Sequence, residues 1–135
     1  MEITGLGSAI VECPRIGKMI QQYGEIFLIR VYREKELVFC QRRTRALEFF
    51  SSFWAAKEAV LNCLGFSGPG VSRTQVEIIM DRQGRPLVQL HGSAKLAAKK
   101  LGIADFMISL ASCRTHATAT VISLPGKAVS SRNRD

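Results

Sequence analysis

The feature that most constrains this fold is an apolar, strongly helix-forming run that contains two adjacent charges. The run is Phe53-Trp54-Ala55-Ala56-Lys57-Glu58-Ala59-Val60. On a helix, the side chains of Lys57 and Glu58 point about 100° apart. One of them can therefore lie at a solvated edge while the other forms an ion pair. The other interpretation is that the two charges serve a functional site.

A strand that contains two glycines is expected near the N-terminus. Residues 3–12 read Ile-Thr-Gly-Leu-Gly-Ser-Ala-Ile-Val-Glu, and Pro14-Arg15-Ile16 then opens a helix, where proline is favoured in the first turn. Together with the central run, this segment resembles the holo-acyl-carrier-protein synthase family. That family has Gly-Ile-Gly-hydrophobic-Asp-Ile, then Arg-Ile, and later Phe-Ala-Ala-Lys-Glu-Ala. Both motifs occur here at a similar separation, which makes the resemblance fairly specific.

Further segments match the same family and extend the resemblance over about residues 1–124. Phe27 and Arg30 precede a short Glu-containing helix, as in the family. Gly84-Arg85-Pro86 matches a turn between two strands. The final hairpin of the family corresponds to Ser109-Leu110 and to residues 117–122.

The resemblance implies an α+β fold of the 4′-phosphopantetheinyl transferase type, in which an antiparallel sheet packs with helices. It implies a homotrimer, because the family builds its cofactor site between subunits. The implied reaction, part of fatty acid biosynthesis, transfers the 4′-phosphopantetheine arm of coenzyme A to a serine of an acyl carrier protein. Coenzyme A and the carrier protein are therefore the expected partners, and Mg²⁺ is the expected metal.

The resemblance also assigns roles to individual residues. Glu58 is expected to be a metal ligand and a catalytic residue, and Lys57 a cation for the phosphates or the leaving group. Carrier-protein contacts are expected at Arg15, Phe27 and Arg30. The cofactor-binding positions implied by the family are Asn62, Gly84, Arg85, Pro86, Ser109 and Ser112.

Three positions depart from the family pattern. Ala9 stands where the family has a metal-binding Asp, Asn62 where it has a Lys, and Ser112 where it has a His. A methyl group cannot bind a metal, and Asn62 carries no charge. A second function is therefore open: a protein without turnover that keeps the fold and binds coenzyme A, the carrier protein or both.

Simpler interpretations remain open for several of these residues. Arg15 can be a solvated helix charge, Asn62 a neutral helix position, and Gly84 a residue required only by a turn. His116 has no partner visible in the sequence. We expect aromatic residues of the central helix to belong to the core, namely Phe49, Phe50, Phe53 and Trp54.

Composition narrows the class of protein. A chain of 135 residues with 47% hydrophobic and 22% charged residues is expected to form one globular domain, residues 1–124, with a polar and disordered tail at 125–135. The formal charge of +8 fits an acidic carrier protein and a phosphate-rich cofactor better than nucleic acid, for which no motif is present. Membrane-spanning and signal-peptide patterns are missing, so we expect a cytoplasmic protein. We expect the four cysteines to be reduced and mostly buried.

The periodicity of apolar residues and the positions of Gly and Pro predict the order of elements. Gly24, Gly65 and Gly102 are expected to end helices, Gly84 to lie in a hairpin turn, and Ser93 to cap a helix. Strands are expected at about 2–12, 75–80, 86–91, 105–112 and 116–123, in one antiparallel sheet, and helices at about 14–23, 34–40, 44–64 and 93–101.

Overall fold

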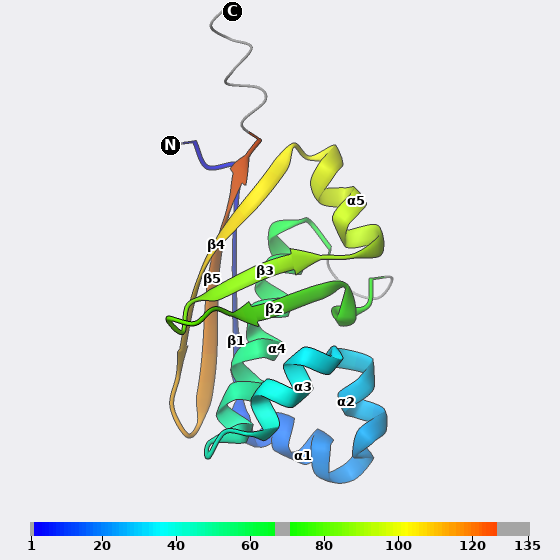
Figure 1. The fold of residues 1–135 in the computed structure, drawn as a ribbon, viewed down its shortest axis with the longest axis vertical. Helices are drawn as coiled ribbons and strands as arrows, with labels where there is room; N and C mark the ends of the chain where they lie inside the picture. The colour runs from blue at the N-terminus through cyan, green and yellow to red at the C-terminus, as the bar shows by residue number, and fades with distance from the viewer. Residues whose placement is uncertain (1, 67–70, 127–135) are drawn as a thin grey trace, which may run out of the picture.

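Helix α4 (Ala46–Cys63) is the element around which the fold is arranged. Figure 1 shows it between a long sheet and a short hairpin in the computed structural model, which describes residues 2–66 and 71–126. The strands are β1 (Gly5–Glu12), β2 (Val76–Met80), β3 (Pro86–Leu90), β4 (Ile103–Ser112) and β5 (His116–Pro125). The other helices are α1 (Cys13–Tyr23), α2 (Glu25–Val31), α3 (Glu34–Gln41) and α5 (Gly92–Lys100), with a 3₁₀ turn, η1, at Arg73–Gln75.

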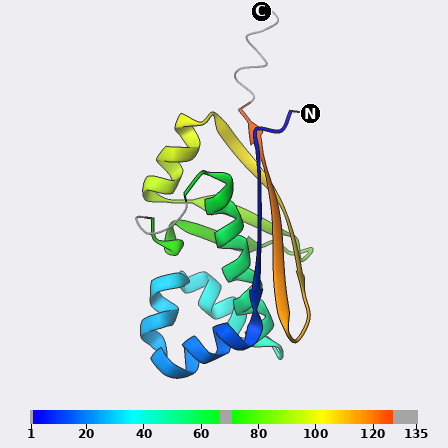
Figure 2. The ribbon, with the colours of Figure 1, turned by 180° about the vertical axis from the view of Figure 1, so that it is seen from behind.

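The strands form two antiparallel sheets. The larger has the order β1-β5-β4, and the smaller is the β2-β3 hairpin. Alternate residues of β5 point inward, so that Ala117, Ala119 and Val121 are buried against α4. Seen from behind in Figure 2, α1, α2 and α3 gather at one end of α4 and α5 lies at the other. The long sheet therefore has one face covered by α4.

Glycines in β1 allow this strand to approach α4 closely. A Cβ built on Gly7 would lie 2.1 Å from the carbonyl oxygen of Ala59, and one built on Gly5 would lie 3.2 Å from the Sγ of Cys63. Position 7 can accept only glycine, because the obstacle is helix backbone rather than a flexible side chain. The two glycines of the N-terminal motif thus have a packing role.

This close approach predicts a large cost for one added methyl group. We expect Gly7→Ala to lower the free energy of unfolding by about 3 kcal/mol, because β1 or α4 must shift to relieve the clash. Gly17→Ala is the matched control: its Cβ would lie 3.2 Å from a flexible side chain, that of Leu47, and alanine is favoured over glycine in a helix by about 1 kcal/mol. Urea unfolding of both variants measures the difference. Equal stability of the two variants would contradict the close approach.

The predicted element order is confirmed in most places. Gly24, Gly65 and Gly102 follow the ends of α1, α4 and α5 with positive φ angles of 55°, 86° and 74°. Phe50 and Phe53 are buried, whereas Phe49 and Trp54 are half-buried and pack against the core.

Several predictions of local structure are wrong. The strands form two sheets rather than one. Helix α2 was not expected, and Ser93 does not cap α5: its hydroxyl donates instead to Oε1 of Gln75, at 2.7 Å. Two of the four cysteines, Cys13 and Cys40, are buried, but Cys113 is exposed, so the thiols are less buried than expected.

Two further expectations concern the C-terminal tail and membrane-spanning segments. The tail predicted for 125–135 lies outside the described residues from 127 onward. Among the helices of the described ranges, none has the length and apolar character needed to cross a bilayer.

Candidate functional site

Glu58 forms an ion pair with Arg73 on the side of α4 that faces η1. The Nε of Arg73 donates to Oε1 of Glu58 at 2.9 Å, and its Nη2 donates to the same oxygen. The guanidinium also lies over the indole of Trp54, 4.2 Å from the ring centroid. Arg73 is therefore held by a carboxylate and by an aromatic face, two partners that suit its planar charge.

Lys57 points away from this pair and is completely buried. Its Nζ donates to Oε1 of Glu36 at 2.8 Å and to the carbonyl oxygens of Arg73 and Val76 at 3.2 and 2.5 Å. An ammonium has three N–H donors, so all of them have partners here. To contact a phosphate, Lys57 would have to leave Glu36, and the phosphate role expected for it stays a prediction.

Glu36 is the acceptor that ties α3 to the hairpin. Its Oε1 accepts from the backbone N–H of Arg33 at 2.7 Å, and its Oε2 from that of Ile78 at 2.8 Å. With Lys57 these contacts join α3, α4, η1 and β2 through one buried ion pair. Since Lys57 holds the carbonyl of Arg73, the pair also fixes the backbone from which the Arg73 side chain extends.

Burial shifts the ionisation of groups around this pair. Desolvation lowers the pKa of Lys57, while the Glu36 carboxylate opposes that shift. Burial, together with Glu36, raises the pKa of the Cys40 thiol to about 12, so this thiol stays neutral at physiological pH. Cys40 is thus an inert core residue.

Ala9 and Asn62 lie where β1 passes α4. Gly5 lies near Cys63 and Gly7 near Ala59, so the strand runs opposite to the helix and Ala9 comes level with the turn that contains Glu58. Ala9 belongs to the inward-facing residues of β1 and packs against the core. The side-chain amide of Asn62 donates to the carbonyl oxygen of Ser8 at 3.2 Å, which gives this residue a contact with β1.

A groove of about 390 Å³ runs from α1 and α2 to the Glu58–Arg73 pair. Its floor is aromatic, because Phe27 stacks on Trp54 with ring centroids 6.0 Å apart. Arg30, which is exposed, and Arg73 contribute its two cations. Arg15 is one helical turn before Met19, which lines the groove. The residues that line the groove are Met19, Tyr23, Ile26, Phe27, Arg30, Val31, Trp54 and Arg73.

The other expected cofactor residues lie elsewhere in the chain. Gly84, Pro86 and Ser112 line a separate hollow of about 230 Å³ that also contains Ser52 and Phe53. Ser112 and Ser109 stand at positions of opposite parity in a regular part of β4, so they face opposite sides of the sheet. The structure thus brings Gly84, Pro86 and Ser112 together but leaves Ser109 apart from them.

Arg85 is tied into its own turn. Asp81 accepts from the backbone N–H of Arg85 at 2.8 Å through Oδ1, and from its Nε at 3.1 Å through Oδ2. These hydrogen bonds, the backbone one foremost, lower the pKa of Asp81. Gly84 adopts a φ of 79°, which glycine adopts without strain. The turn is therefore well defined without any ligand.

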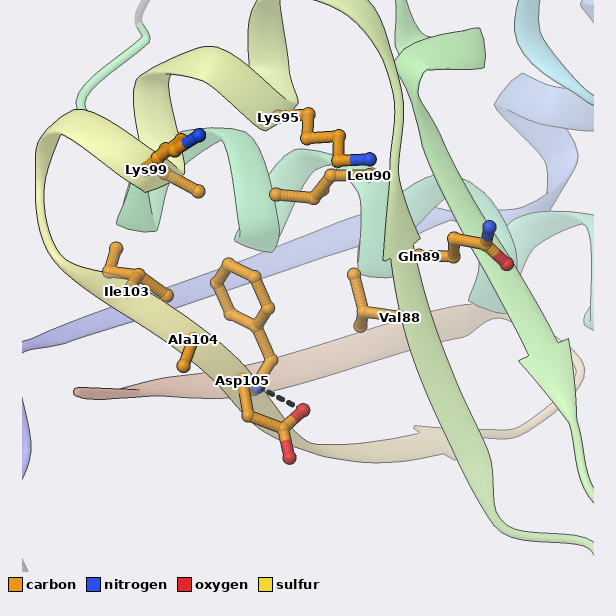
Figure 3. A pocket seen from close by; sticks show the side chains of 10 residues that line it. Val88, Gln89, Leu90, Lys95, Lys99, Ile103, Ala104 and Asp105 are labelled. Atoms are coloured by element: carbon orange, nitrogen blue, oxygen red, sulfur yellow. Dashed lines mark hydrogen bonds between the residues drawn. The ribbon is translucent and has the colours of Figure 1, made fainter. Parts of the chain in front are cut away.

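A third hollow, of about 460 Å³, lies between β3, α5 and β4. Figure 3 shows Lys95 and Lys99 of α5 on one side of it and Asp105 of β4 on the other. Its apolar lining includes Val88 and Leu90. None of the site residues expected from the sequence lies in this hollow.

Sequence reasoning missed two residues that shape the site. These residues are Arg73 and Glu36, and neither belongs to a motif from which a site was expected. The one signal for Glu36 was Lys57 itself, because a charge in an apolar helix requires a partner. No pattern indicated Arg73, since its contact with Glu58 joins residues 15 positions apart across a loop.

Comparisons with known proteins agree with this fold. Residues 5–121 match the family model of the 4′-phosphopantetheinyl transferase superfamily. A holo-[acyl-carrier-protein] synthase of Rhodopirellula baltica is 43% identical over 122 residues, covering 90% of this chain and 98% of the relative. A holo-[acyl-carrier-protein] synthase of Gloeobacter violaceus is 36% identical, covering 86% and 89%.

Solved structures show the same architecture. The crystal structure of the holo-ACP synthase of Plasmodium yoelii superposes with a TM-score of 0.79 at 27% identity, covering 93% of this chain and 97% of the other. That of the Helicobacter pylori holo-[acyl-carrier-protein] synthase in complex with coenzyme A superposes with a TM-score of 0.76 at 26% identity, covering 88% and 99%. The fold is thus that of a phosphopantetheinyl transferase. The chain belongs to the 4′-phosphopantetheinyl transferase superfamily, and its curated relatives are holo-[acyl-carrier-protein] synthases.

Proposed function

We propose that this protein transfers the 4′-phosphopantetheine arm of coenzyme A to a serine of an acyl carrier protein. Family membership supports the reaction class, and one feature of the structure carries the proposal for this chain. The groove lined by Phe27, Trp54 and Arg30 ends at the Glu58–Arg73 pair. A carrier helix lying in the groove would bring its serine next to charges suited to phosphates.

The chemistry requires stabilisation of charge at phosphate. The serine hydroxyl gives its proton to water, its oxygen forms a new bond to phosphorus, the pyrophosphate bond of coenzyme A breaks, and adenosine 3′,5′-bisphosphate leaves. Negative charge develops on phosphate oxygens as that bond breaks, and fixed cations lower its energy. Of the two cations of the groove, Arg73 is the one that Glu58 and Trp54 align.

The residues present do not fit Mg²⁺ in the form that the family resemblance implies. In the described part of the chain, Glu58 is the carboxylate found at the site, and Arg73 already occupies one of its oxygens. Position 9 offers a methyl group instead of a second acid. Within residues 2–66 and 71–126, no group of three or more His, Cys, Asp or Glu side chains is arranged to hold a metal. We therefore assign no step of the reaction to a metal ion.

Release of the leaving group tests the proposed reaction. Purified protein, coenzyme A and apo carrier protein are mixed, and adenosine 3′,5′-bisphosphate is measured by chromatography. Release should require the carrier, and a carrier whose acceptor serine is replaced by alanine should abolish it. Release that is the same with both carriers would reflect hydrolysis and contradict transfer.

A second function, binding without turnover, is favoured by Ala9, which stands where the family has an acid. Ala9 removes one acid, and Arg73 engages the other. The groove and the Glu58–Arg73 pair could still hold the carrier protein and coenzyme A. Under this alternative, both ligands bind but no bisphosphate is released.

The groove predicts an electrostatic contribution to carrier binding. Arg30→Glu should weaken binding of the acidic carrier about tenfold, equivalent to about 1.4 kcal/mol, while leaving coenzyme A binding unchanged. Arg15, placed one turn before the groove, should show the same effect when reversed. Because exposed charges are screened over about 10 Å at 0.1 M salt, the difference should shrink as salt rises. Calorimetry measures both affinities.

Arg42→Glu is the matched control, since Arg42 is exposed on another surface at the end of α3. It makes the same change in net charge as the Arg30 variant. Equal weakening by Arg30→Glu and Arg42→Glu would mean that net charge, rather than the groove, attracts the carrier.

A homotrimer would complete the site and cover an apolar face. The outer side of the long sheet exposes Leu6 and Ile10 of β1 and Met107 of β4, with exposed fractions of 68%, 67% and 50%. Leu6 and Met107 flank Ile122 of β5 in one row across the three strands. Such a face favours association. The expected cofactor residues Gly84, Pro86 and Ser112 line a hollow apart from the groove that Arg73 lines, and this separation supports a site shared by subunits.

Light scattering at micromolar concentration should give the mass of a trimer. Leu6→Lys should shift the population toward monomer, because it places three like charges in the buried interface. Lys35→Glu on α3 is the control, because it leaves the outer face of the long sheet unchanged. Ser8→Lys cannot serve as a control, because Ser8 lies on the same face as Leu6. A monomeric wild type would contradict the shared site. The cytoplasmic location expected from the sequence remains part of this proposal.

A further inference from the structure

Three independent contacts fix Arg73 at the candidate site. Its guanidinium pairs with Glu58 and lies over Trp54, and its carbonyl oxygen accepts from the buried Nζ of Lys57 at 3.2 Å. The side chains of Arg73 and Glu58 are 36% and 26% exposed, so the pair is accessible from solvent. An arginine held in this way has lost most of its freedom before any ligand arrives.

The pair leaves donors free for a ligand. A guanidinium has five N–H groups, and two of them point to Oε1 of Glu58, which leaves three. The freed donors belong to Nη1 and Nη2 at the tip of the side chain. Arg73 lines the groove and its side chain is 36% exposed, so these donors are open to an anion from solvent. Guanidinium groups with two available N–H donors bind phosphate in a bidentate manner.

The charges at the site balance without a second acid at position 9. Two carboxylates and one divalent cation have zero net charge, and so do one carboxylate and one guanidinium. This chain has Glu58 and Arg73, with Ala9 in place of the second acid. A divalent ion at Glu58 would have to displace Arg73 or accept its repulsion. The presence of Arg73 beside Glu58 and the absence of an acid at position 9 are thus consistent with each other.

We propose that Arg73 takes the place of the divalent metal in this chain. Its guanidinium, oriented by Glu58 and Trp54, binds the phosphate groups of coenzyme A, so that binding does not require Mg²⁺. The inference rests on the proposed function for the identity of the ligand. The groove also supports this role, because it places the guanidinium of Arg73 where the acceptor serine of a bound carrier protein would approach.

Calorimetry with coenzyme A tests the inference without relying on turnover. Wild-type protein should bind coenzyme A with the same affinity, within about twofold, in EDTA and in Mg²⁺. Arg73→Met keeps the apolar stem over Trp54 but removes the charge, and should weaken binding about 10–100-fold in EDTA, the loss expected for a charged hydrogen bond. Arg42→Met is the matched control and should bind as the wild type does.

A second variant keeps the test decisive if Arg73→Met perturbs the loop. Arg73→Met combined with Ala9→Asp restores two carboxylates and removes the arginine, so its binding should be recovered by Mg²⁺ and lost again in EDTA. Wild-type binding that disappears in EDTA would overturn the inference and leave the proposed function standing. Wild-type protein that binds the carrier but never coenzyme A would overturn both.

Discussion

Replacing Lys57 with methionine should lower the free energy of unfolding by about 3–5 kcal/mol, the cost of leaving a buried charge without its partner. Glu36 would keep the backbone N–H groups of Arg33 and Ile78 but lose its counterion. The carbonyl oxygens of Arg73 and Val76 would lose their donor as well. Urea unfolding followed by circular dichroism measures the change.

Two further variants distinguish the loss of the ion pair from the general effect of replacing a lysine on stability. Lys35→Met, at an exposed position of α3, should change stability by less than about 0.5 kcal/mol. Lys57→Met combined with Glu36→Gln should recover part of the loss, because an uncharged amide remains where a carboxylate would be unpaired. A Lys57→Met variant within about 1 kcal/mol of the wild type would show that the pair does not hold α3, α4 and β2 together.

Ala9→Asp should make the protein respond to Mg²⁺. The new carboxylate would lie on the inward face of β1, level with the turn of Glu58, and two acids suit Mg²⁺ better than one. Two carboxylates together outweigh the single positive charge of Arg73, so we expect tighter Mg²⁺ binding in the presence of coenzyme A. The transfer rate should rise about 100-fold, the size of one electrostatic contact at an active site. Asn62→Lys should add to the gain by bringing a cation to the same phosphates.

The control for Ala9→Asp is the same variant in chelator, where the second acid has no metal to bind and the rate should not rise. Val11→Asp would be unsuitable, since Val11 is a core residue. Calorimetry and rate measurements under identical Mg²⁺ provide the comparison. A folded Ala9→Asp variant with unchanged metal affinity and rate would show that position 9 is not the counterpart of the family's metal-binding Asp.

Local patterns predicted most elements of the fold. Glycines with positive φ end α1, α4 and α5, because the need for a left-handed residue after a helix can be read from a single position. Helix α2 escaped prediction because Gly24, which ends α1, also begins the next helix without a break. The division into two sheets escaped it too, since strand pairing depends on contacts between distant segments.

The candidate site, too, could be predicted only where local patterns were sufficient. Glu58 and Lys57 could be singled out because charges in an apolar helix are costly. Their opposite surroundings could not be predicted: Glu58 lies at a solvent-accessible groove, whereas Lys57 lies in the core with Glu36. Arg73 and Glu36 reach them from other elements, and only the folded chain brings these residues together.

The mass of the carrier protein after incubation with coenzyme A tests the proposed transfer most directly. Apo carrier protein in large excess is treated with this protein, and mass spectrometry counts the phosphopantetheine arms added per chain. The account predicts several arms for each chain of the wild type, with chelator present as well as with Mg²⁺. A carrier that binds to the protein yet keeps its apo mass under both conditions would contradict transfer and leave a binding protein in its place.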